Sequence, residues 1–291
     1  MRVLSLFDGI SCGMVALERA GVEVEEYIAY EIDKYAIKIS KNNYPKTKHK
    51  GNVVGADFTD YEGVELLIGG SPCQDLSNYK YYKNDVKGLE GEKSNLFYQF
   101  VRALKEVKPK FFLLENVYSM EKKWVDVISQ ELGVEPIMIN SSSVCAAERK
   151  RLYWTNIPNI TEINDKGIML KDIVLPPDEV EKKYWYDKSF VYHGDDKKVQ
   201  CTLDMKGHRS MKEVYNLKGK CNTLLCDGDG GHRQKKVFQN GKCRKLTPLE
   251  YERLQTLPDD YTDVVSDSRR YTAIGNGWTV DVIAHIFKGL K

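Results

Sequence analysis

The chain has 291 residues, of which 42% are hydrophobic and 30% charged, a composition typical of a globular protein with one large domain and a smaller one. No apolar run reaches the roughly 18 residues that a membrane span needs, and the N-terminal apolar run is predicted to be a first strand and not a signal peptide. Seven cysteines without a C-x-x-C pair favour a reducing, cytoplasmic setting over a disulfide framework.

The net charge of +2 hides an uneven distribution. Between Lys197 and Lys245 the chain has 13 Lys or Arg residues and four Asp or Glu residues, so this segment carries +9 and the remainder −7. A basic block on a mildly acidic body predicts a polyanionic partner. The alternative is a lysine-rich surface that is merely solvated.

The first half of the chain alternates strand and helix patterns. Alternation of this kind predicts an α/β fold with a doubly wound, mostly parallel sheet, whose ligand site lies beyond the carboxyl ends of the strands. The predicted strands are 3–7, 27–32, 64–70, 111–116, 135–140 and 151–157, and the predicted helices between them are 14–20, 35–41, 96–107 and 124–132.

The alternation stops after about residue 158. Residues 161–245 are polar, basic and rich in turn signals, and we interpret them as a second, smaller domain. The predicted catalytic domain is therefore 1–160, completed by 246–291.

Helical patterns return near the C-terminus. Thr247, Pro248 and Glu250 form a capping signal that starts a helix at 247–255. A final helix is predicted at about 279–290, with an apolar stripe that indicates packing.

Polar residues follow four of the predicted strands, where α/β proteins place their chemistry. The first strand leads into FDGISCGM (7–14), a glycine-containing turn that suits a nucleotide-type cofactor, although it is not G-x-G-x-x-G. Glu31 follows the second strand and is well placed to accept hydrogen bonds from ribose hydroxyls. Cys73 follows the strand 64–70 in GGSPCQDLS, and Glu115 and Asn116 end a later strand.

Each of these residues has an ordinary structural interpretation, because a lone cysteine is often a small buried residue and a strand-end acid is often a cap. A thiol and a carboxyl group at strand ends of one sheet instead favour chemistry. An acid that contacts N3 of cytosine makes C6 electrophilic, and addition of a thiolate at C6 makes C5 nucleophilic toward a sulfonium methyl donor.

Arg149 and Arg151 are spaced i, i+2, so both face one side if they lie on one strand. They would then hold the base carbonyl or a phosphate and favour the thiolate. The alternative is a salt-bridged sheet edge.

In their order and number, these motifs resemble those of the cytosine-C5 DNA methyltransferase family over nearly the whole catalytic portion. FDGISCG, Glu31-Ile32-Asp33 and Asp57-Phe58 are similar to its cofactor motifs, and SPCQ, ENV and ERKR to its nucleophile, proton-donor and paired-arginine motifs. Residues 244–261 and 273–287 resemble the last two motifs. Details such as GGSPC resemble the de novo branch known from animals, but we expect a stand-alone bacterial or phage enzyme.

The resemblance implies a Rossmann-like methyltransferase fold that transfers a methyl group from S-adenosyl-L-methionine to C5 of cytosine in DNA, with S-adenosyl-L-homocysteine as product. It implies that Cys73 adds to C6 of a flipped cytosine, that Glu115 contacts N3, and that Asn116 positions the Cys73 loop. Arg149 and Arg151 would bind around the base. The residues implied to line the cofactor pocket are Phe7, Asp8, Gly9, Ile10, Gly13, Glu31, Ile32, Asp57, Phe58, Pro72, Leu96, Asn276 and Trp278.

The basic segment falls where this family has its target-recognition domain, so the resemblance implies double-stranded DNA as partner, with a cognate restriction endonuclease if the enzyme is part of a restriction–modification system. An aromatic-basic loop after the nucleophile and three residues of the recognition segment are the candidate DNA contacts: Tyr79, Lys80, Lys83, Arg209, His232 and Arg233.

Three alternatives stay open. The same chemistry could act on tRNA, the protein could be a catalytically silent DNA-binding partner, or it could be a nicotinamide oxidoreductase, although the glycine fingerprint is missing. No metal is predicted, because the possible zinc ligands Cys221, Cys226, His232 and Cys243 lack a paired spacing. The recognised DNA sequence does not follow from these residues.

Overall fold

The computed structural model describes residues 1–76, 88–225 and 233–291. The chain divides into two compact units, each with its own sheet. The first unit comprises Met1–Asn140, Lys150–Thr161 and Val282–Lys291, and the second comprises Ser141–Arg149 and Glu162–Asp281. Residues 246–281, which the sequence assigns to the catalytic domain, thus group with the second unit by their contacts, and the functional domain assignment stays a prediction.

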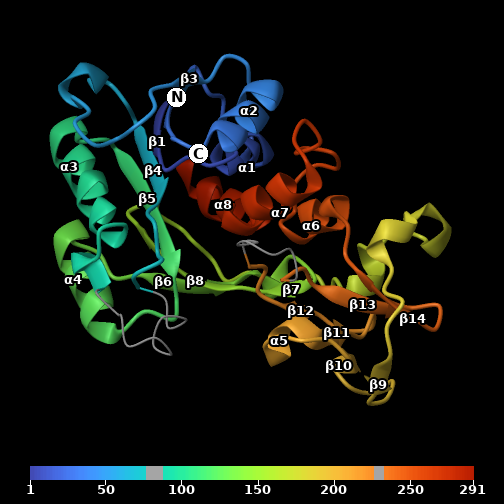
Figure 1. Ribbon diagram of the computed structural model, residues 1–291. Helices are drawn as coiled ribbons and strands as arrows, with labels where there is room; N and C mark the ends of the chain where they lie inside the picture. The colour runs from blue at the N-terminus through green and yellow to red at the C-terminus, as the bar shows by residue number, and fades with distance from the viewer. Residues whose placement is uncertain (77–87, 226–232) are drawn as a thin grey trace. The chain divides into compact units, whose positions relative to one another are not determined.

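A seven-stranded sheet forms the centre of the first unit, in the order β3-β2-β1-β4-β5-β8-β6 (Figure 1). The pairs from β3 to β5 are all parallel, whereas β8 runs antiparallel to both of its neighbours. This arrangement confirms the predicted mostly parallel α/β sheet. The strands are β1 (Arg2–Leu6), β2 (Glu26–Tyr30), β3 (Lys48–His49), β4 (Leu66–Gly70), β5 (Phe111–Val117), β6 (Ile137–Asn140) and β8 (Lys150–Thr155).

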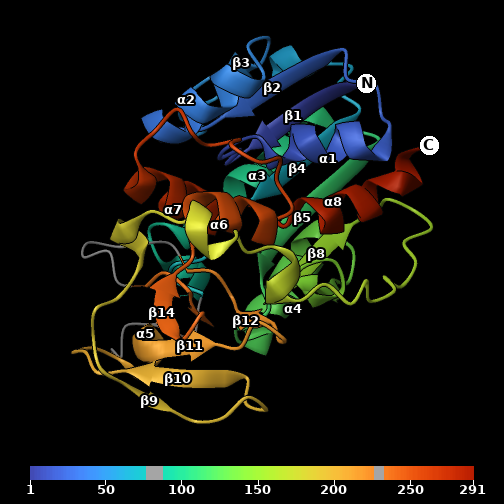
Figure 2. The same cartoon turned by 90° about the vertical axis from the view of Figure 1, so that its right-hand side faces the viewer.

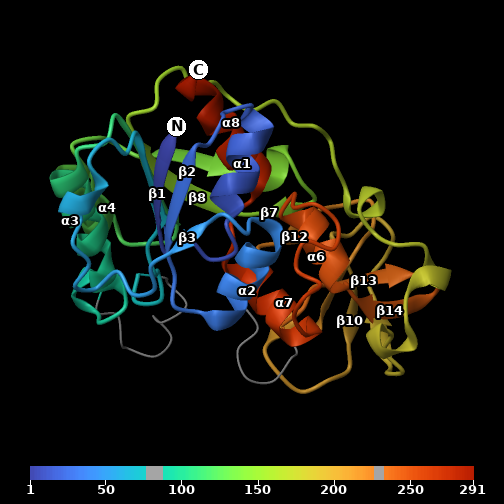
Figure 3. The ribbon, with the colours of Figure 1, turned by 90° about the horizontal axis from the view of Figure 1, so that it is seen from above.

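Helices cover both faces of this sheet. Figures 1 and 3 show α3 (Phe97–Val107) and α4 (Lys122–Leu132) on one face, and α1 (Cys12–Ala20), α2 (Lys34–Asn43) and α8 (Val280–Phe287) on the other. Asp33 begins α2 because its carboxylate accepts the N–H groups of Tyr35 and Ala36. The 3-10 turns of this unit are η1 (Thr59–Tyr61), η3 (Gly88–Glu90), η4 (Ser94–Leu96) and η9 (Lys288–Leu290).

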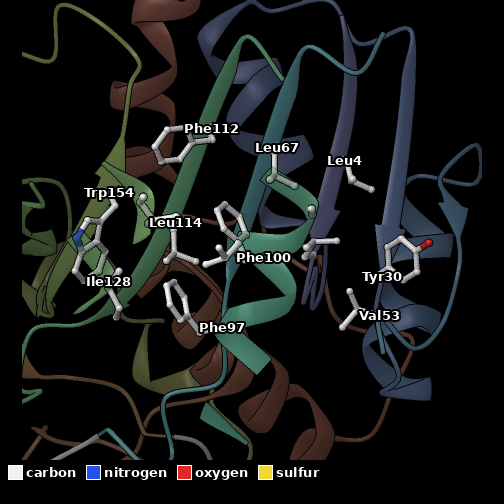
Figure 4. Packing of buried hydrophobic residues seen from close by; sticks show 14 of the residues in the cluster. Leu4, Tyr30, Val53, Leu67, Phe97, Phe100, Phe112, Leu114, Ile128 and Trp154 are labelled. Carbon is white, nitrogen blue, oxygen red and sulfur yellow. The ribbon is translucent and has the colours of Figure 1, made fainter. Parts of the chain in front are cut away.

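One hydrophobic core cluster of the first unit lies between the sheet and the α3–α4 layer (Figure 4). Phe97 and Phe100 of α3 pack toward Leu67 on β4, and all three side chains are fully buried. Trp154 of β8 lies beside Ile128 of α4, and its indole N–H donates to Ser129 Oγ at 3.0 Å. The helical period of apolar residues in α3 therefore fixes this helix rigidly against the strands that carry the predicted site.

The second unit has a mixed five-stranded sheet in the order β14-β13-β11-β10-β9 and a separate pair, β7 with β12. Figure 1 labels these strands, and Figure 2 shows β9, β10, β11 and β14 in a second view. The pairs β11–β13 and β7–β12 are parallel and the others antiparallel. The strands are β7 (Ala147–Glu148), β9 (Phe190–Tyr192), β10 (Val199–Leu203), β11 (Glu213–Tyr215), β12 (Cys221–Asn222), β13 (Lys236–Gln239) and β14 (Lys242–Lys245).

The helices of the second unit are short. They are α5 (Arg209–Lys212), α6 (Pro248–Leu254) and α7 (Asp267–Asn276), with 3-10 turns η5 (Ser141–Ser143), η6 (Leu170–Asp172), η7 (Pro177–Glu179) and η8 (Lys182–Tyr184). The capping box predicted for α6 is confirmed, since Thr247 accepts the Glu250 N–H and the Glu250 carboxylate accepts the Thr247 N–H.

Three members of the predicted basic block are buried. Lys236 and Arg244 are fully buried and Lys235 nearly so, and burial lowers the pKa of Lys235. Arg244 forms a buried ion pair with Glu250, in which Nη2 and Oε1 lie 2.6 Å apart. Breaking such a pair typically costs about 3–5 kcal/mol. These residues therefore stabilise the second unit, and fewer positive charges reach its surface than the composition suggests.

Among the helices of the described ranges, none is both long and apolar enough to cross a membrane.

Candidate active site and cofactor turn

The predicted nucleophile lies in the loop that follows β4. Gly69, the next-to-last residue of that strand, is tightly enclosed, because a Cβ there would lie 2.9 Å from the Phe100 ring. The glycine thus lets α3 pack against the strand end. Gly70 is paired in register with Glu115 on β5, so the loop that carries Cys73 starts beside the strand end that carries the predicted acid. The half-buried Cys73 packs against the core of the first unit.

Asn116 joins the two strand ends. Its Nδ2 donates to the carbonyl oxygen of Ser71 at 3.3 Å and to Ser71 Oγ at 3.0 Å, and its side chain is almost fully buried. Ser71 lies two residues before Cys73, so Asn116 fixes the start of the thiol-bearing loop. This contact fits the positioning role that the resemblance implies for Asn116.

Glu115 is held by an arginine from the neighbouring strand. Its Oε1 lies 2.8 Å from Nε of Arg151 on β8, and both side chains are largely buried. The antiparallel register pairs Arg151 with Val117, two residues beyond Glu115, which brings the guanidinium group alongside the carboxylate. A base at this strand end would therefore meet a carboxylate–guanidinium pair and not an isolated acid.

Arg149 does not share the environment of Arg151. The strand is interrupted at Arg149, which lies between β7 and β8, so the condition that both arginines lie on one strand is not met. The buried Arg149 side chain instead donates to the carbonyl oxygens of Gly277 at 3.1 Å and of Leu224 and Gly275 at 3.4 Å. With these three hydrogen bonds, the Arg149 side chain connects main-chain segments of the second unit.

The turn after β1 has an unusual backbone. Phe7, Gly9 and Ser11 all have positive φ angles, of 58°, 60° and 59°, a region that non-glycine residues seldom adopt. The Gly9 N–H donates to Glu31 Oε2 at 2.8 Å, while Glu31 Oε1 accepts the N–H groups of the next two residues. The Glu31 carboxylate thus ties the end of β2 to the turn. With about four lone-pair positions on its two oxygens, it retains capacity to accept a hydroxyl.

Asp8 holds this turn from inside. Its Oδ1 accepts the hydroxyls of Ser5 and Tyr27 at 2.7 Å each, and its Oδ2 accepts the Ser11 hydroxyl at 2.5 Å. Burial raises the pKa of Asp8 to about 6, although these three hydroxyl donors act in the opposite direction. The carboxylate therefore stabilises a strained turn at the cost of its own desolvation.

The sequence over residues 1–291 matches the family described as C-5 cytosine-specific DNA methylase. The chain belongs to this family. It is 26% identical over 311 residues to the type II methyltransferase M.HhaI of Haemophilus parahaemolyticus, covering 98% of this chain and 93% of that relative. It is also 26% identical over 431 residues to the orphan methyltransferase M.SPBetaI of Bacillus phage SPbeta, covering 100% and 97%.

The fold agrees with this assignment. The solved structure of the Entamoeba histolytica methyltransferase EhMeth superposes with a TM-score of 0.77 at 17% identity, covering 100% of this chain and 99% of that one. The protein is thus a DNA cytosine-5 methyltransferase, and the family match favours this activity over the tRNA-directed, silent and oxidoreductase alternatives. The family implies S-adenosylmethionine as the methyl donor.

The turn after β1 and the residues next to it have features that fit S-adenosylmethionine. Ile32 is 73% exposed directly after Glu31, so an apolar side chain is presented where the face of an adenine could rest. A Cβ on Gly9 would meet nothing within 4 Å, so the backbone there is open to a ligand. Asp57 is exposed, and its carboxylate is held by the N–H and hydroxyl of Thr59.

The other predicted cofactor residues differ in exposure. Phe58 is fully buried in the core, where the Arg102 guanidinium lies 4.4 Å from its ring centre, so its ring is not on an open pocket wall. Asn276 and Trp278 belong to the second unit. Among the remaining ones, Phe7, Asp8, Pro72 and Leu96 are half-buried, and Ile10 and Gly13 are buried.

The predicted DNA contacts are only partly described. Tyr79, Lys80, Lys83 and His232 lie outside the described residues. Arg209 begins α5, and its side chain is 86% exposed with Nε 3.5 Å from Glu213, while Arg233 is half-buried.

In the described part of the chain, no group of three or more His, Cys, Asp or Glu side chains could hold a metal ion. Of the zinc alternatives, Cys221 and Cys243 are buried, and Cys226 is outside the described residues.

Two residues that contact the Cys73 loop carry no sequence signal that relates them to each other. Asp75 and Ser94 are buried and hydrogen-bonded to each other around the Cys73 loop. Asp75 is part of GGSPCQDLS, and its position two residues after Cys73 is the one sequence feature that relates it to the site. Nothing in the spacing relates it to Ser94, nineteen residues later.

One pH-dependent prediction follows from Asp8. In the folded protein its pKa is about 6, above its ordinary value of 3.8, so the folded state binds its proton more tightly. The stability that Asp8 contributes is therefore greatest below pH 3.8 and is lost as the pH rises through 6. We expect the wild-type unfolding free energy, minus that of Asp8→Asn, to fall by about 2–3 kcal/mol between pH 4 and 7.

Denaturant titrations at several pH values measure this difference. Asp259→Asn is the matched control, because the hydrogen bond from Arg253 lowers the pKa of Asp259, so the stability that Asp259 contributes does not fall between pH 4 and 7. A flat difference for Asp8→Asn over this range would show that Asp8 carries no raised pKa.

Proposed function

We propose that Cys73 is the nucleophile of this methyltransferase and that the Glu115–Arg151 pair activates the target cytosine. One observation carries the proposal: the thiol-bearing loop and the ion pair occupy adjacent strand ends of one sheet, and Asn116 joins these ends. Adjacent carboxyl ends of parallel strands are where this class of fold binds its ligands.

The Cys73 thiolate forms a bond to C6, and the electrons of the C5–C6 double bond move toward C5 while the Glu115 carboxyl group interacts with N3. C5 then takes the methyl group, a base removes the C5 proton, and the bond between sulfur and C6 breaks as the double bond forms again. Arg151 holds Glu115 in place throughout and contacts the base from the same side.

S-adenosylmethionine, when bound, supplies the methyl group as an electrophilic sulfonium centre. The residues that would hold it are those of the turn after β1, with Glu31 for the ribose hydroxyls and Ile32 for the purine face. Asp57 and Leu96 lie on the adjacent loops of the first unit. Asn276 and Trp278 are proposed from their motif alone.

The DNA duplex is the proposed macromolecular substrate, with target recognition in the basic segment 161–245. Its exposed charges, such as Arg209, would contact base edges or phosphates, and the target cytosine would be flipped out of the helix. Given the type II and phage relatives, we propose action on DNA in a bacterial cytoplasm, with or without a cognate restriction endonuclease.

The test compares methyl incorporation from labelled S-adenosylmethionine into duplex DNA and into tRNA. We expect label in duplex DNA, with every modified position mapped by bisulfite sequencing to cytosine within a short recognition sequence. Label confined to tRNA, or located on adenine or on the exocyclic nitrogen of cytosine, would overturn the proposal.

A further inference from the structure

We propose that Asp75 and Ser94 are positioning residues that set the main-chain geometry of Cys73 for attack on C6. The inference rests on the proposed role of Cys73 as nucleophile. It concerns the side of the thiol-bearing loop that Asn116 does not contact, where β4 meets the segment that leads into α3.

The Ser94 hydroxyl group bridges the two sides of Cys73. It donates to the carbonyl oxygen of Pro72 at 3.1 Å, and it accepts the N–H of Asp75 at 3.2 Å. The first group is the carbonyl of the residue directly before Cys73, and the second is the amide of the residue two positions after it. Ser94 is fully buried, so water cannot replace the hydroxyl if it is removed.

The Asp75 carboxylate in turn accepts hydrogen bonds from the segment that contains Ser94. Its Oδ2 accepts the N–H of Lys93 at 3.2 Å and the N–H of Ser94 at 3.1 Å, at the start of the turn η4 that continues into α3. An acid in this position satisfies amide groups that have no partner within the helix. The Asp75 side chain is also buried, with 6% of the residue exposed.

Gly91 shows how closely this carboxylate is enclosed. A Cβ at Gly91 would lie 2.4 Å from the carboxyl carbon of Asp75, closer than any real contact of this kind. A side chain at residue 91 would therefore displace Asp75 without altering any group that bonds to it. This offers a third, independent way to disturb the arrangement.

These contacts connect the loop that carries Cys73 to a helix whose two phenylalanine side chains are buried in the core of the first unit. Phe97 and Phe100 anchor α3 in the core, and Ser94 lies three residues before Phe97. Cys73 is thus fixed from β5 through Asn116 and from α3 through Ser94 and Asp75. Displacing a reacting atom by about 1 Å can lower a reaction rate about 100-fold. Attachment of the loop on both sides therefore keeps the Cys73 sulfur where it can react.

The experiment measures single-turnover formation of the covalent adduct on duplex DNA that contains 5-fluorocytosine, at saturating S-adenosylmethionine. Ser94→Ala, Asp75→Ala and Gly91→Ala are each expected to slow adduct formation by about 10- to 100-fold. Asp75→Asn retains an oxygen that can accept both N–H groups, so it should stay within about threefold of the wild type. Asp126→Ala removes a surface carboxylate of α4 whose Oδ1 lies 2.6 Å from Lys122 Nζ, and serves as the control.

Dissociation constants for S-adenosylmethionine, measured on the same variants, separate positioning from general loss of structure. We expect them to change far less than the rate does, because these contacts set the geometry at the thiol. Of the proposed cofactor residues they involve the Pro72 carbonyl, whereas the Glu31 contacts with the turn after β1 are left intact. The inference is overturned if the three disruptive variants form the adduct at the wild-type rate, or if cofactor affinity falls in parallel with the rate. It is also overturned if Asp75→Asn is as slow as Asp75→Ala. Failure of the wild type itself to form an adduct through Cys73 would instead refute the proposed function.

Discussion

Cys73→Ser is expected to lose methyl transfer by about 10⁴-fold or more while it still binds S-adenosylmethionine and DNA. A serine hydroxyl is not ionised near neutral pH and is a far weaker nucleophile than a thiolate, so addition at C6 fails. The half-buried Cys73 side chain differs from serine by one atom, and the fold should tolerate the change. Single-turnover transfer of labelled methyl groups, with isothermal titration of the cofactor, measures both quantities.

Cys145→Ser is the matched control for the loss of a thiol. Cys145 is buried in the second unit and donates to the carbonyl oxygens of Ser141 and Ala147, contacts that a serine hydroxyl can retain. We expect near wild-type transfer from this control. Normal turnover by Cys73→Ser would refute the role of the thiol.

Glu115→Gln is expected to lower the methyl-transfer rate by about 10²- to 10⁴-fold, the range typical for removal of an acid–base group. Glutamine matches the size of glutamate but can neither share a proton with N3 nor form an ion pair with Arg151. C6 would then remain a poor electrophile even with the thiolate in place. The rate of the chemical step at saturating DNA and cofactor measures the effect.

Glu131→Gln is the control for the loss of a carboxylate. Glu131 forms an ion pair of 3.0 Å with Lys105 on the surface of the first unit, and pairs of this kind contribute about 0–1 kcal/mol. Its transfer rate should match the wild type. If Glu115→Gln retained the wild-type rate with the same folding stability, Glu115 would be a structural partner of Arg151 and nothing more.

Local patterns predict the first unit well, because its elements follow strong, short-range rules. The strand at 111–116 appears as β5, from Phe111 to Val117, and the helix at 96–107 as α3, from Phe97 to Val107. Both carry apolar residues at the period of their element. The capping box at Thr247 was equally local, since its two partners lie three residues apart.

The second unit could not be predicted in this way. Its strands have two to five residues each and contain lysine and glutamine at buried positions, so neither length nor alternation distinguishes them from turns. The composition predicts Lys236 and Arg244 as part of a basic surface, whereas both are buried, because burial of a charge depends on partners that tertiary structure supplies. The helix α7 begins at Asp267 and includes Gly275, and its weak helical pattern was not recognised.

The site shows the same division between local and non-local information. Cys73, Glu115 and Asn116 are found from the sequence because each follows or ends a strong strand pattern. The different surroundings of Arg149 and Arg151 have a local cause, since a one-residue interruption between β7 and β8 leaves no trace in the spacing. Asp75 and Ser94 meet only because α3 packs against β4, and no rule of spacing relates residues brought together by packing.

The most direct test identifies the amino acid that bonds to the base. Duplex DNA with 5-fluorocytosine at the mapped target position is incubated with the wild-type enzyme and S-adenosylmethionine, and the trapped complex is digested and sequenced by mass spectrometry. We predict that the nucleotide is attached to the peptide that contains SPCQ, through the sulfur of Cys73 and carbon 6 of the pyrimidine. Attachment to another residue, or complete methylation of ordinary DNA by an enzyme that never forms this bond, would contradict the account.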